Sequence, residues 1–175
     1  MKKITIISGT NRQNSYTEKV SKYYHQTLQQ NGHEVQVLLM KEIESILDLS
    51  TYFNKGNVAF DKLVEKYIST TNHFIFVIPE YNGSYPGILK LFLDSVPPAT
   101  WTNKAACITG IASGRAGNLR GIEHLTGVLN YLKMHVYHNR LPISQIDKIF
   151  VATEPLNEDT AKVIKIQLDG FLNFN

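Results

Sequence analysis

Short apolar runs alternate along the chain with longer segments in which apolar residues recur every three or four positions. The strongest run is Phe-Ile-Phe-Val-Ile at 74–78, and a similar run at 4–7 is closed by Ser8 and Gly9. Continuous runs of this length are typical of strands that are buried on both faces of a parallel sheet. Together with these two runs, three further segments complete a set of five predicted strands: 35–39, 104–111 and 134–138.

The segments between the strands carry helical signals. Ser15 and Glu18 stand three positions apart, as in a capping box, and Asn31-Gly32 supplies the end of that first helix. Residues 41–57 predict only one irregular helical turn, followed by a loop around 54–57. Further helices are predicted over 58–69, from Pro86 to the Pro97-Pro98 pair, over 119–132 and from 157 onward.

Strands that alternate with helices imply a parallel sheet with right-handed crossovers. The sequence therefore predicts a three-layer α/β fold with a five-stranded parallel sheet in the order 2-1-3-4-5 and helices on both faces. We expect residues 1–175 to form a single domain. Because such sheets bind ligands beyond the carboxyl ends of their strands, the informative loops follow strands one, three and four.

The amino-acid composition and net charge exclude several classes of protein. Hydrophobic residues make up 43% and charged residues 19% of the sequence, which indicates an ordered globular protein, and a net charge of +3 is too small for a typical nucleic-acid-binding surface. A single cysteine, Cys107, excludes an intrachain disulfide and is expected to fill the core. No apolar stretch approaches the roughly 18 residues of a membrane span, so a cytoplasmic protein is expected. The scattered histidines predict no metal site.

The loop after the first strand, at 8–17, reads Ser-Gly-Thr-Asn-Arg-Gln-Asn-Ser-Tyr-Thr. A turn into a helix N-terminus offers unpaired N–H donors and the positive end of the helix dipole, which favour an anion. The hydroxyl groups of this loop and the planar guanidinium of Arg12 suit a phosphate. The alternative is that these residues only cap a helix. Neither G-x-x-x-x-G-K-[ST] nor G-x-G-x-x-G occurs in the sequence, which favours a terminal monophosphate, as in FMN rather than FAD.

The loop after the third strand, at 79–87, contains two tyrosines, two glycines and two prolines, where surface loops usually carry solvated charges. A flat ring system needs an aromatic platform and a closely approaching backbone, which Tyr81, Gly83 and Tyr85 offer. Main-chain N–H groups and Asn82 offer hydrogen bonds to the polar edge of a flavin. Ser84 is predicted to cap the following helix.

The loop after the fourth strand, at 112–121, combines small residues with Arg115 and Arg120. It is interpreted either as part of the same site or as a flexible turn with solvated arginines. Trp101 likewise has two interpretations, as a cover over the ring or a subunit contact, and as a core or rim residue.

The chain resembles the NADPH-dependent FMN reductase family in two motifs. The family carries P-E-Y-N-x-S-x-P-G-x-L-K, which residues 79–90 match, and G-S-x-R-x-x-S, which residues 9–15 match with Thr for Ser. The order of elements and the chain length agree as well. After Lys90 the sequence departs from the family's frequent L-K-N-A-I-D-W, because residues 89–95 read Leu-Lys-Leu-Phe-Leu-Asp-Ser.

This resemblance implies a flavodoxin-like fold that binds FMN and takes electrons from NADPH or NADH. The residues implied at the phosphate and ribityl end of FMN are Thr10, Arg12, Ser15, Tyr16 and Thr17. Those implied around the isoalloxazine ring are Pro79, Glu80, Tyr81, Asn82, Gly83 and Ser84, with Ser113, Gly114, Arg115 and Gly117 beside its pyrimidine edge. No catalytic protein residue is implied, because the cofactor carries the chemistry.

The implied activity is hydride transfer from NAD(P)H through FMN to a small acceptor, namely a free flavin, quinone, azo compound or ferric chelate. One alternative is a flavodoxin-type electron carrier, which the charge of +3 disfavours because such carriers tend to be acidic. Another is an FMN-binding redox sensor without turnover. The apolar segment 88–93 supports the homodimer or homotetramer that the resemblance implies, and neither nucleic acid nor membrane is an expected partner.

Overall fold

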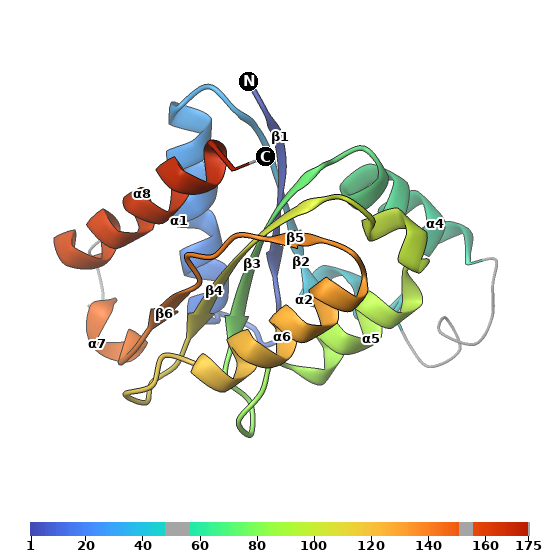
Figure 1. Ribbon diagram of the computed structural model, residues 1–175. Coiled ribbons are helices and arrows are strands. Elements are labelled where there is room, and N and C mark those ends of the chain that lie inside the picture. The colour runs from blue at the N-terminus through green and yellow to red at the C-terminus, as the bar shows by residue number, and fades with distance from the viewer. Residues whose placement is uncertain (48–56, 151–155, 175) are drawn as a thin grey trace.

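The computed structural model describes residues 1–47, 57–150 and 156–174, and it contains one parallel sheet (Figure 1). The strand order is β2-β1-β3-β4-β5, as the sequence predicts. The strands are β1 (Lys3–Ser8), β2 (Glu34–Leu39), β3 (His73–Pro79), β4 (Ala105–Ile111), β5 (His135–Val136) and β6 (Leu141–Ile143). The fifth predicted strand, 134–138, is shortened to β5, and a sixth strand that was not predicted, β6, pairs with a later part of β4.

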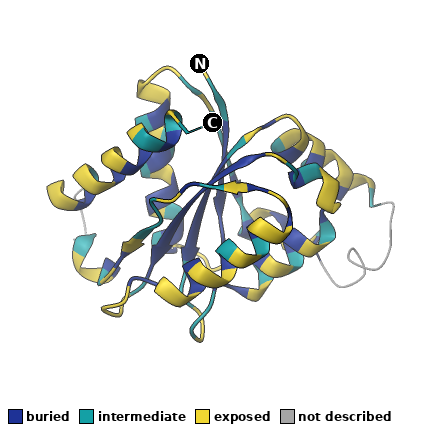
Figure 2. Cartoon of the chain, in the orientation of Figure 1, coloured by how far each residue is buried: buried dark blue, intermediate teal, exposed yellow. Residues whose placement is uncertain are grey.

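Helices cover both faces of the sheet, also as predicted (Figure 1). One face carries α1 (Tyr16–Gln30) and α8 (Glu158–Leu172), and the other carries α4 (Val58–Val64), α5 (Gly87–Ser95) and α6 (Leu119–Tyr131). The short elements are α2 (Met40–Ile43), the π-helix η1 (Glu65–Ser69), the 3₁₀ helix η2 (Pro98–Trp101) and α7 (Ile146–Ile149). The central strands are buried along most of their length (Figure 2).

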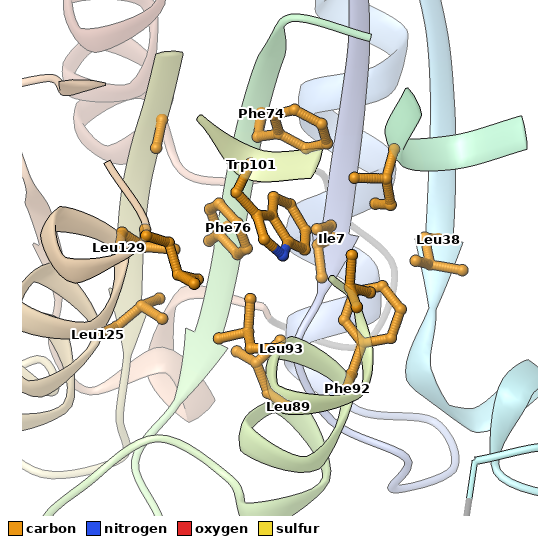
Figure 3. Packing of buried hydrophobic residues seen from close by; sticks show 14 of the residues in the cluster. Ile7, Leu38, Phe74, Phe76, Leu89, Phe92, Leu93, Trp101, Leu125 and Leu129 are labelled. Carbon is orange, nitrogen blue, oxygen red and sulfur yellow. The ribbon is translucent and has the colours of Figure 1, made fainter. Parts of the chain in front are cut away.

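The sheet separates two hydrophobic clusters. On the α4–α5–α6 side, Trp101 is fully buried among Phe74, Phe76 and Phe92, so its role is that of a core residue (Figure 3). On the other side, α1 and α8 bury apolar residues against alternate positions of the same strands. Cys107 lies fully buried in this second cluster, as expected for a filling residue, and burial raises the pKa of its thiol.

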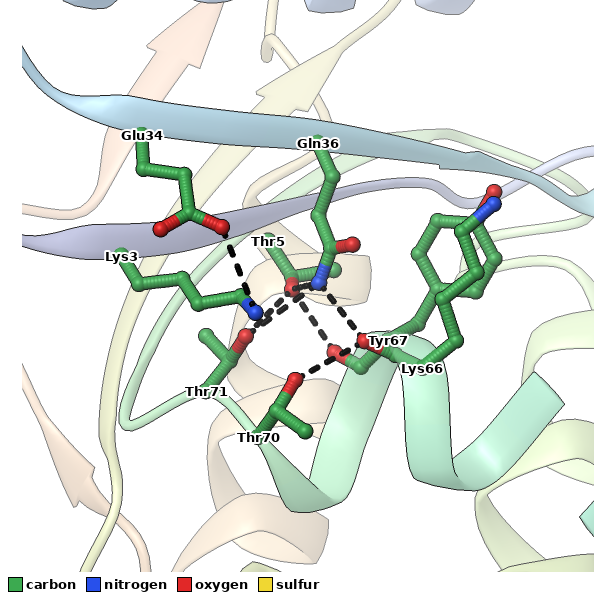
Figure 4. Close-up of polar contacts among 8 residues, drawn as sticks. All are labelled: Lys3, Thr5, Glu34, Gln36, Lys66, Tyr67, Thr70 and Thr71. Atoms are coloured by element: carbon green, nitrogen blue, oxygen red, sulfur yellow. Dashed lines mark hydrogen bonds and ion pairs between the residues drawn. The ribbon is translucent and has the colours of Figure 1, made fainter. Parts of the chain in front are cut away.

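The predicted helix over 58–69 divides into α4 and η1, and side chains from three other segments bind the carbonyl groups where η1 ends. The Thr5 hydroxyl donates to the carbonyl oxygen of Tyr67 at 2.7 Å, and the Gln36 amide donates to Thr5 and to Lys66 (Figure 4). The buried ammonium group of Lys104 donates to the carbonyl oxygens of Ile68 and, at 2.7 Å, of Thr71. These contacts satisfy carbonyl groups that a helix end leaves unpaired.

Of the two predicted helix caps, one is confirmed and the other is wrong. Ser15 is the N-cap of α1, and its Oγ accepts a hydrogen bond from the Glu18 N–H at 3.2 Å, as predicted. The prediction that Ser84 caps α5 is wrong, because α5 begins directly after Pro86 and has no side-chain cap. The expected helical turn after residue 40 is α2, and the expected loop at 54–57 falls almost entirely outside the described residues.

The described residues lack two kinds of feature. None of their helices combines the length and the apolar composition that crossing a bilayer requires. In the same part of the chain, no group of three His, Cys, Asp or Glu side chains is placed to hold a metal ion.

Candidate functional site

A cleft of about 460 Å³ opens at the carboxyl ends of β1, β3 and β4. This position beside the central strands is where open parallel sheets bind ligands, and the volume lies in the range of small-molecule sites. Nine residues predicted for the site line the cleft: Thr10, Arg12, Ser15, Tyr16, Thr17, Pro79, Glu80, Tyr81 and Ser113. The structure thus brings the two family motifs together.

The loop after β1 is held close to β3 at Gly9. The Gly9 N–H donates to the carbonyl oxygen of Val77 at 2.9 Å. A Cβ atom at this position would lie 3.0 Å from Ile78, 3.1 Å from Leu89 and 3.2 Å from that carbonyl oxygen. A glycine therefore allows the loop to cross directly over β3, which places Thr10 at the cleft.

The end of the cleft beside α1 is rich in hydrogen-bond donors. The first N–H groups of α1 have no partner within the helix, and the positive end of its dipole faces the same region. Thr17 is buried at the cleft wall, and its hydroxyl has no hydrogen-bond partner among the described residues. Arg12 makes no ion pair within that part of the chain either. This donor set fits a phosphate group.

Glu18 lies in the first turn of α1, but its negative charge is offset by ion pairs and does not repel an anion in the cleft. Hydrogen bonds from Lys22 and then from Lys41 hold the pKa of its carboxyl below the usual value, so the group stays ionised but neutralised. Lys41 is the residue after the start of α2, and this ion pair joins the two helices. Because two lysines face one carboxylate, this ion-pair group leaves no excess negative charge, and Arg12 adds positive charge at the cleft itself.

Only part of the loop after β3 lines the cleft. Tyr81 lines the cleft, and its hydroxyl lies 2.8 Å from the Thr10 Oγ1. Asn82 and Gly83 both have positive φ and form a two-residue turn in which Tyr81 and Ser84 exchange backbone hydrogen bonds. Asn82, Gly83 and Ser84 are not among the residues that line the cleft.

Two aromatic and polar side chains of this segment have other contacts. Tyr85, considered above as a ring platform, is instead buried in the core, where burial and then Asp94 raise its pKa to about 12. The Ser84 hydroxyl lies 2.9 Å from the Nδ1 of His124 on α6. Tyr81 is thus the one tyrosine of the motif that borders the cleft.

The loop after β4 likewise contributes only some of its residues to the cleft. Ser113 lines the cleft, whereas Gly114 and Arg115 are exposed beyond it. Gly117 is a packing residue: its φ is +60°, and a Cβ atom there would lie 2.8 Å from Pro142. Next to it, the buried Asn118 donates to the carbonyl oxygen of Ile78 at 3.0 Å and accepts from Gly121, which ties this loop to the end of β3.

Five cleft residues were not predicted: Gln13, Asn14, Ile111, Ala112 and Ile146. Gln13 and Asn14 lie within the first motif, and Ile111 and Ala112 sit at the end of β4. Ile146 is brought in by two backbone hydrogen bonds, from Ala112 to Ile143 and from Ile146 to Ala112. These bonds extend the pairing of β6 with β4, so no local pattern around Ile146 indicates its place in the cleft.

The fold and the position of the cleft define a flavodoxin-like α/β protein. A flavoenzyme, the NAD(P)H:(acceptor) oxidoreductase of Paracoccus denitrificans, superposes with a TM-score of 0.82 and 22% identity, covering 99% of this chain and 97% of that one. A flavodoxin from Pseudomonas aeruginosa superposes with a TM-score of 0.63 and 14% identity, covering 95% of this chain and 97% of its own. At these identities the likeness concerns the fold.

The sequence profile described as NADPH-dependent FMN reductase matches residues 2–147, and the chain belongs to this family. An NAD(P)H-dependent FMN reductase of Pseudomonas aeruginosa is 33% identical over 121 residues, which cover 65% of each chain. A 2-hydroxy-1,4-benzoquinone reductase of a Burkholderia species is 31% identical over 116 residues, 59% of this chain and 60% of that one. The matches thus span slightly under two thirds of these relatives.

Proposed function

We propose that this protein binds FMN in the cleft and acts as an NAD(P)H-dependent oxidoreductase on a small acceptor. The observation that carries the proposal is the junction of two different surfaces in one cleft. Hydroxyl groups, Arg12 and the α1 N-terminus come from the segment after β1, and Pro79, Tyr81 and Ile146 add apolar and aromatic surface from other segments. A ligand that combines a phosphate with a flat ring matches this lining.

The residues have distinct proposed roles. Thr10, Arg12, Ser15, Tyr16 and Thr17 bind the phosphate and ribityl chain, while Pro79, Glu80, Tyr81 and Ser113 border the ring. Backbone groups of the turn at Asn82, Gly83 and Ser84, and of the loop at Gly114, Arg115 and Gly117, are proposed to lie at the outer edge of the ring. Bound FMN supplies the redox chemistry of accepting a hydride from NAD(P)H and passing two electrons on. The protein contributes binding, orientation and exclusion of water.

Quinones and free flavins are the proposed acceptors. The names of the two curated relatives specify one acceptor of each kind, and both belong to proteins about a third identical to this chain. We propose that the whole chain acts as a single FMN-binding domain. The competing role is that of an electron carrier or redox sensor, and the experiment below distinguishes these roles from a reductase.

The test is an absorbance spectrum of the purified protein after incubation with FMN and desalting, followed by anaerobic NADPH. We expect retained flavin absorbance that bleaches with NADPH and returns on adding a quinone. Arg12→Met should retain less flavin, whereas Lys162→Met, an exposed cation on α8, should retain as much as the wild type. Retained flavin that NADPH does not bleach would contradict the reductase and indicate a carrier or sensor.

We also propose a homodimer or homotetramer that forms through a groove between α5 and α6. The groove, of about 670 Å³, is lined by apolar Leu93, Val128 and Leu132 together with charged Lys90 and Glu123. Tyr131 lines the same groove and is 85% exposed. Light scattering should give a multiple of 19.8 kDa, and Tyr131→Glu should lower it. An Ile166→Glu variant on the exposed face of α8 should leave the mass unchanged.

A further inference from the structure

The hydroxyl of Thr10 is the point where the two motif loops meet. Thr10 is only 3% exposed, and its Oγ1 accepts a hydrogen bond from the Arg12 N–H at 3.3 Å. The same oxygen lies 2.8 Å from the hydroxyl of Tyr81, which comes from the loop after β3. Both residues line the cleft.

The donor and acceptor capacity of this hydroxyl decides what it can offer a ligand. A threonine oxygen has one hydrogen to donate and two lone pairs to accept with. The backbone N–H of Arg12 can only donate, so it occupies one lone pair. If Thr10 donated to Tyr81, its single hydrogen would be spent within the protein. If Tyr81 donates, both lone pairs are filled and the Thr10 hydrogen is free for the cleft.

The second arrangement is favoured on two grounds. A phenolic hydroxyl is a stronger donor and a weaker acceptor than an aliphatic one, so the pair is better matched when Tyr81 donates. An anion in the cleft would attract the free Thr10 hydrogen, and a hydrogen bond from Tyr81 polarises the Thr10 hydroxyl further. Bonds to charged acceptors are also the stronger ones.

We propose that Tyr81 is a positioning residue that acts through Thr10: its hydroxyl fixes the Thr10 hydroxyl as a donor to the phosphate of FMN. The inference rests on the FMN-binding function proposed above. It makes Tyr81 responsible for recognition of the phosphate, although Tyr81 belongs to the loop that borders the ring. Removing the phenolic oxygen should therefore weaken binding of FMN but not of riboflavin, which lacks the phosphate.

The experiment measures dissociation constants for FMN and riboflavin in the wild type, Tyr81→Phe, Thr10→Val and the double variant. Tyr81→Phe should weaken FMN binding roughly 3- to 10-fold and leave riboflavin binding within twofold. The double variant should lose no more than Thr10→Val alone, because the two residues act in one chain. Thr10→Ser, which keeps the hydroxyl, should bind FMN nearly as the wild type does.

Tyr23→Phe is the matched control, because Tyr23 is a partly exposed tyrosine on α1 outside the cleft. Circular dichroism and melting curves should show that all variants fold. Three results would overturn this inference but not the proposed function. Tyr81→Phe could weaken binding of both flavins equally or of neither, or the double variant could lose the sum of the two single losses in FMN affinity. A wild type that binds neither flavin would overturn the proposed function and the inference with it.

Discussion

The side-chain amide of Gln167 on α8 donates a 2.8 Å hydrogen bond to the carbonyl oxygen of Asn139, in the gap between β5 and β6. The same amide donates to the carbonyl oxygen of Ile108 on β4 at 3.0 Å. A helix side chain thus supplies the hydrogen bonds that the missing part of the strand would have made. The Gln167 oxygen accepts from the hydroxyl groups of Tyr24 and Thr109, so the whole group is satisfied inside the protein.

Gln167→Leu should lower the free energy of unfolding by about 2–4 kcal/mol, since it leaves several buried polar groups without partners. Urea titration measures this change. Gln26→Leu, on the exposed side of α1, should change stability by less than about 0.5 kcal/mol. A Gln167 variant as stable as its control would show that water replaces the amide.

Trp101→Ala should destabilise the protein by about 3–5 kcal/mol, because it empties the aromatic cluster of Phe74, Phe76 and Phe92. Trp101→Phe should cost clearly less. The indole N–H of Trp101 is buried and has no hydrogen-bond partner among the residues that the structure describes, so its removal offsets part of the lost packing. Thermal unfolding followed by calorimetry compares the two variants. Both variants remove the indole N–H, so equal losses would mean that the phenyl ring restores none of the lost packing.

Gly110→Ala should destabilise the end of β4 by about 1–3 kcal/mol, through overpacking. A Cβ atom there would lie 2.7 Å from Ile122 and 2.8 Å from the Gly117 carbonyl oxygen. The matched control is Gly114→Ala, because no atom lies within 4 Å of its added Cβ and its φ is not in the positive range. Melting temperatures of the two variants provide the comparison. A Gly110 variant that melts with its control would contradict the close packing.

Stability should fall as the pH drops below about 6.5, the ordinary pKa of histidine. Burial, and then the ammonium group of Lys2 at 2.7 Å, lower the pKa of His73 in the folded protein. Burial also lowers that of His33. The unfolded chain therefore takes up protons first, so the contribution present above pH 6.5 is lost as the pH falls toward the folded-state values.

NMR titration of the His73 ring gives its folded-state pKa directly. Lys2→Met should raise that pKa toward the ordinary value and reduce the loss of stability in acid. Lys3→Met, which removes the neighbouring ion pair with Glu34, should leave the His73 titration in place. A His73 pKa above 6.5 in the wild type would refute the expected direction.

The sequence predicts most of the fold, because each central strand is an apolar run and each long helix has an amphipathic repeat. Strand β6 was not predicted, and the gap between β5 and β6 is bridged by Gln167, which lies some 30 positions later in the chain. The same limit applies to the site. The loop of the first motif is local and lines the cleft, whereas Ile146 is brought to the cleft by the pairing of β6 with β4, and Gly117 is a packing residue.

Gly9 sets how closely the loop that carries Thr10 lies to β3. The loop that carries Thr10 rests on Val77, Ile78 and Leu89 with no room for a side chain between them. A larger residue at this position would lift the whole donor array outward by a few tenths of an ångström, and hydrogen bonds weaken steeply with such displacement. For the FMN site proposed above, affinity is therefore expected to depend on position 9, although Gly9 does not line the cleft.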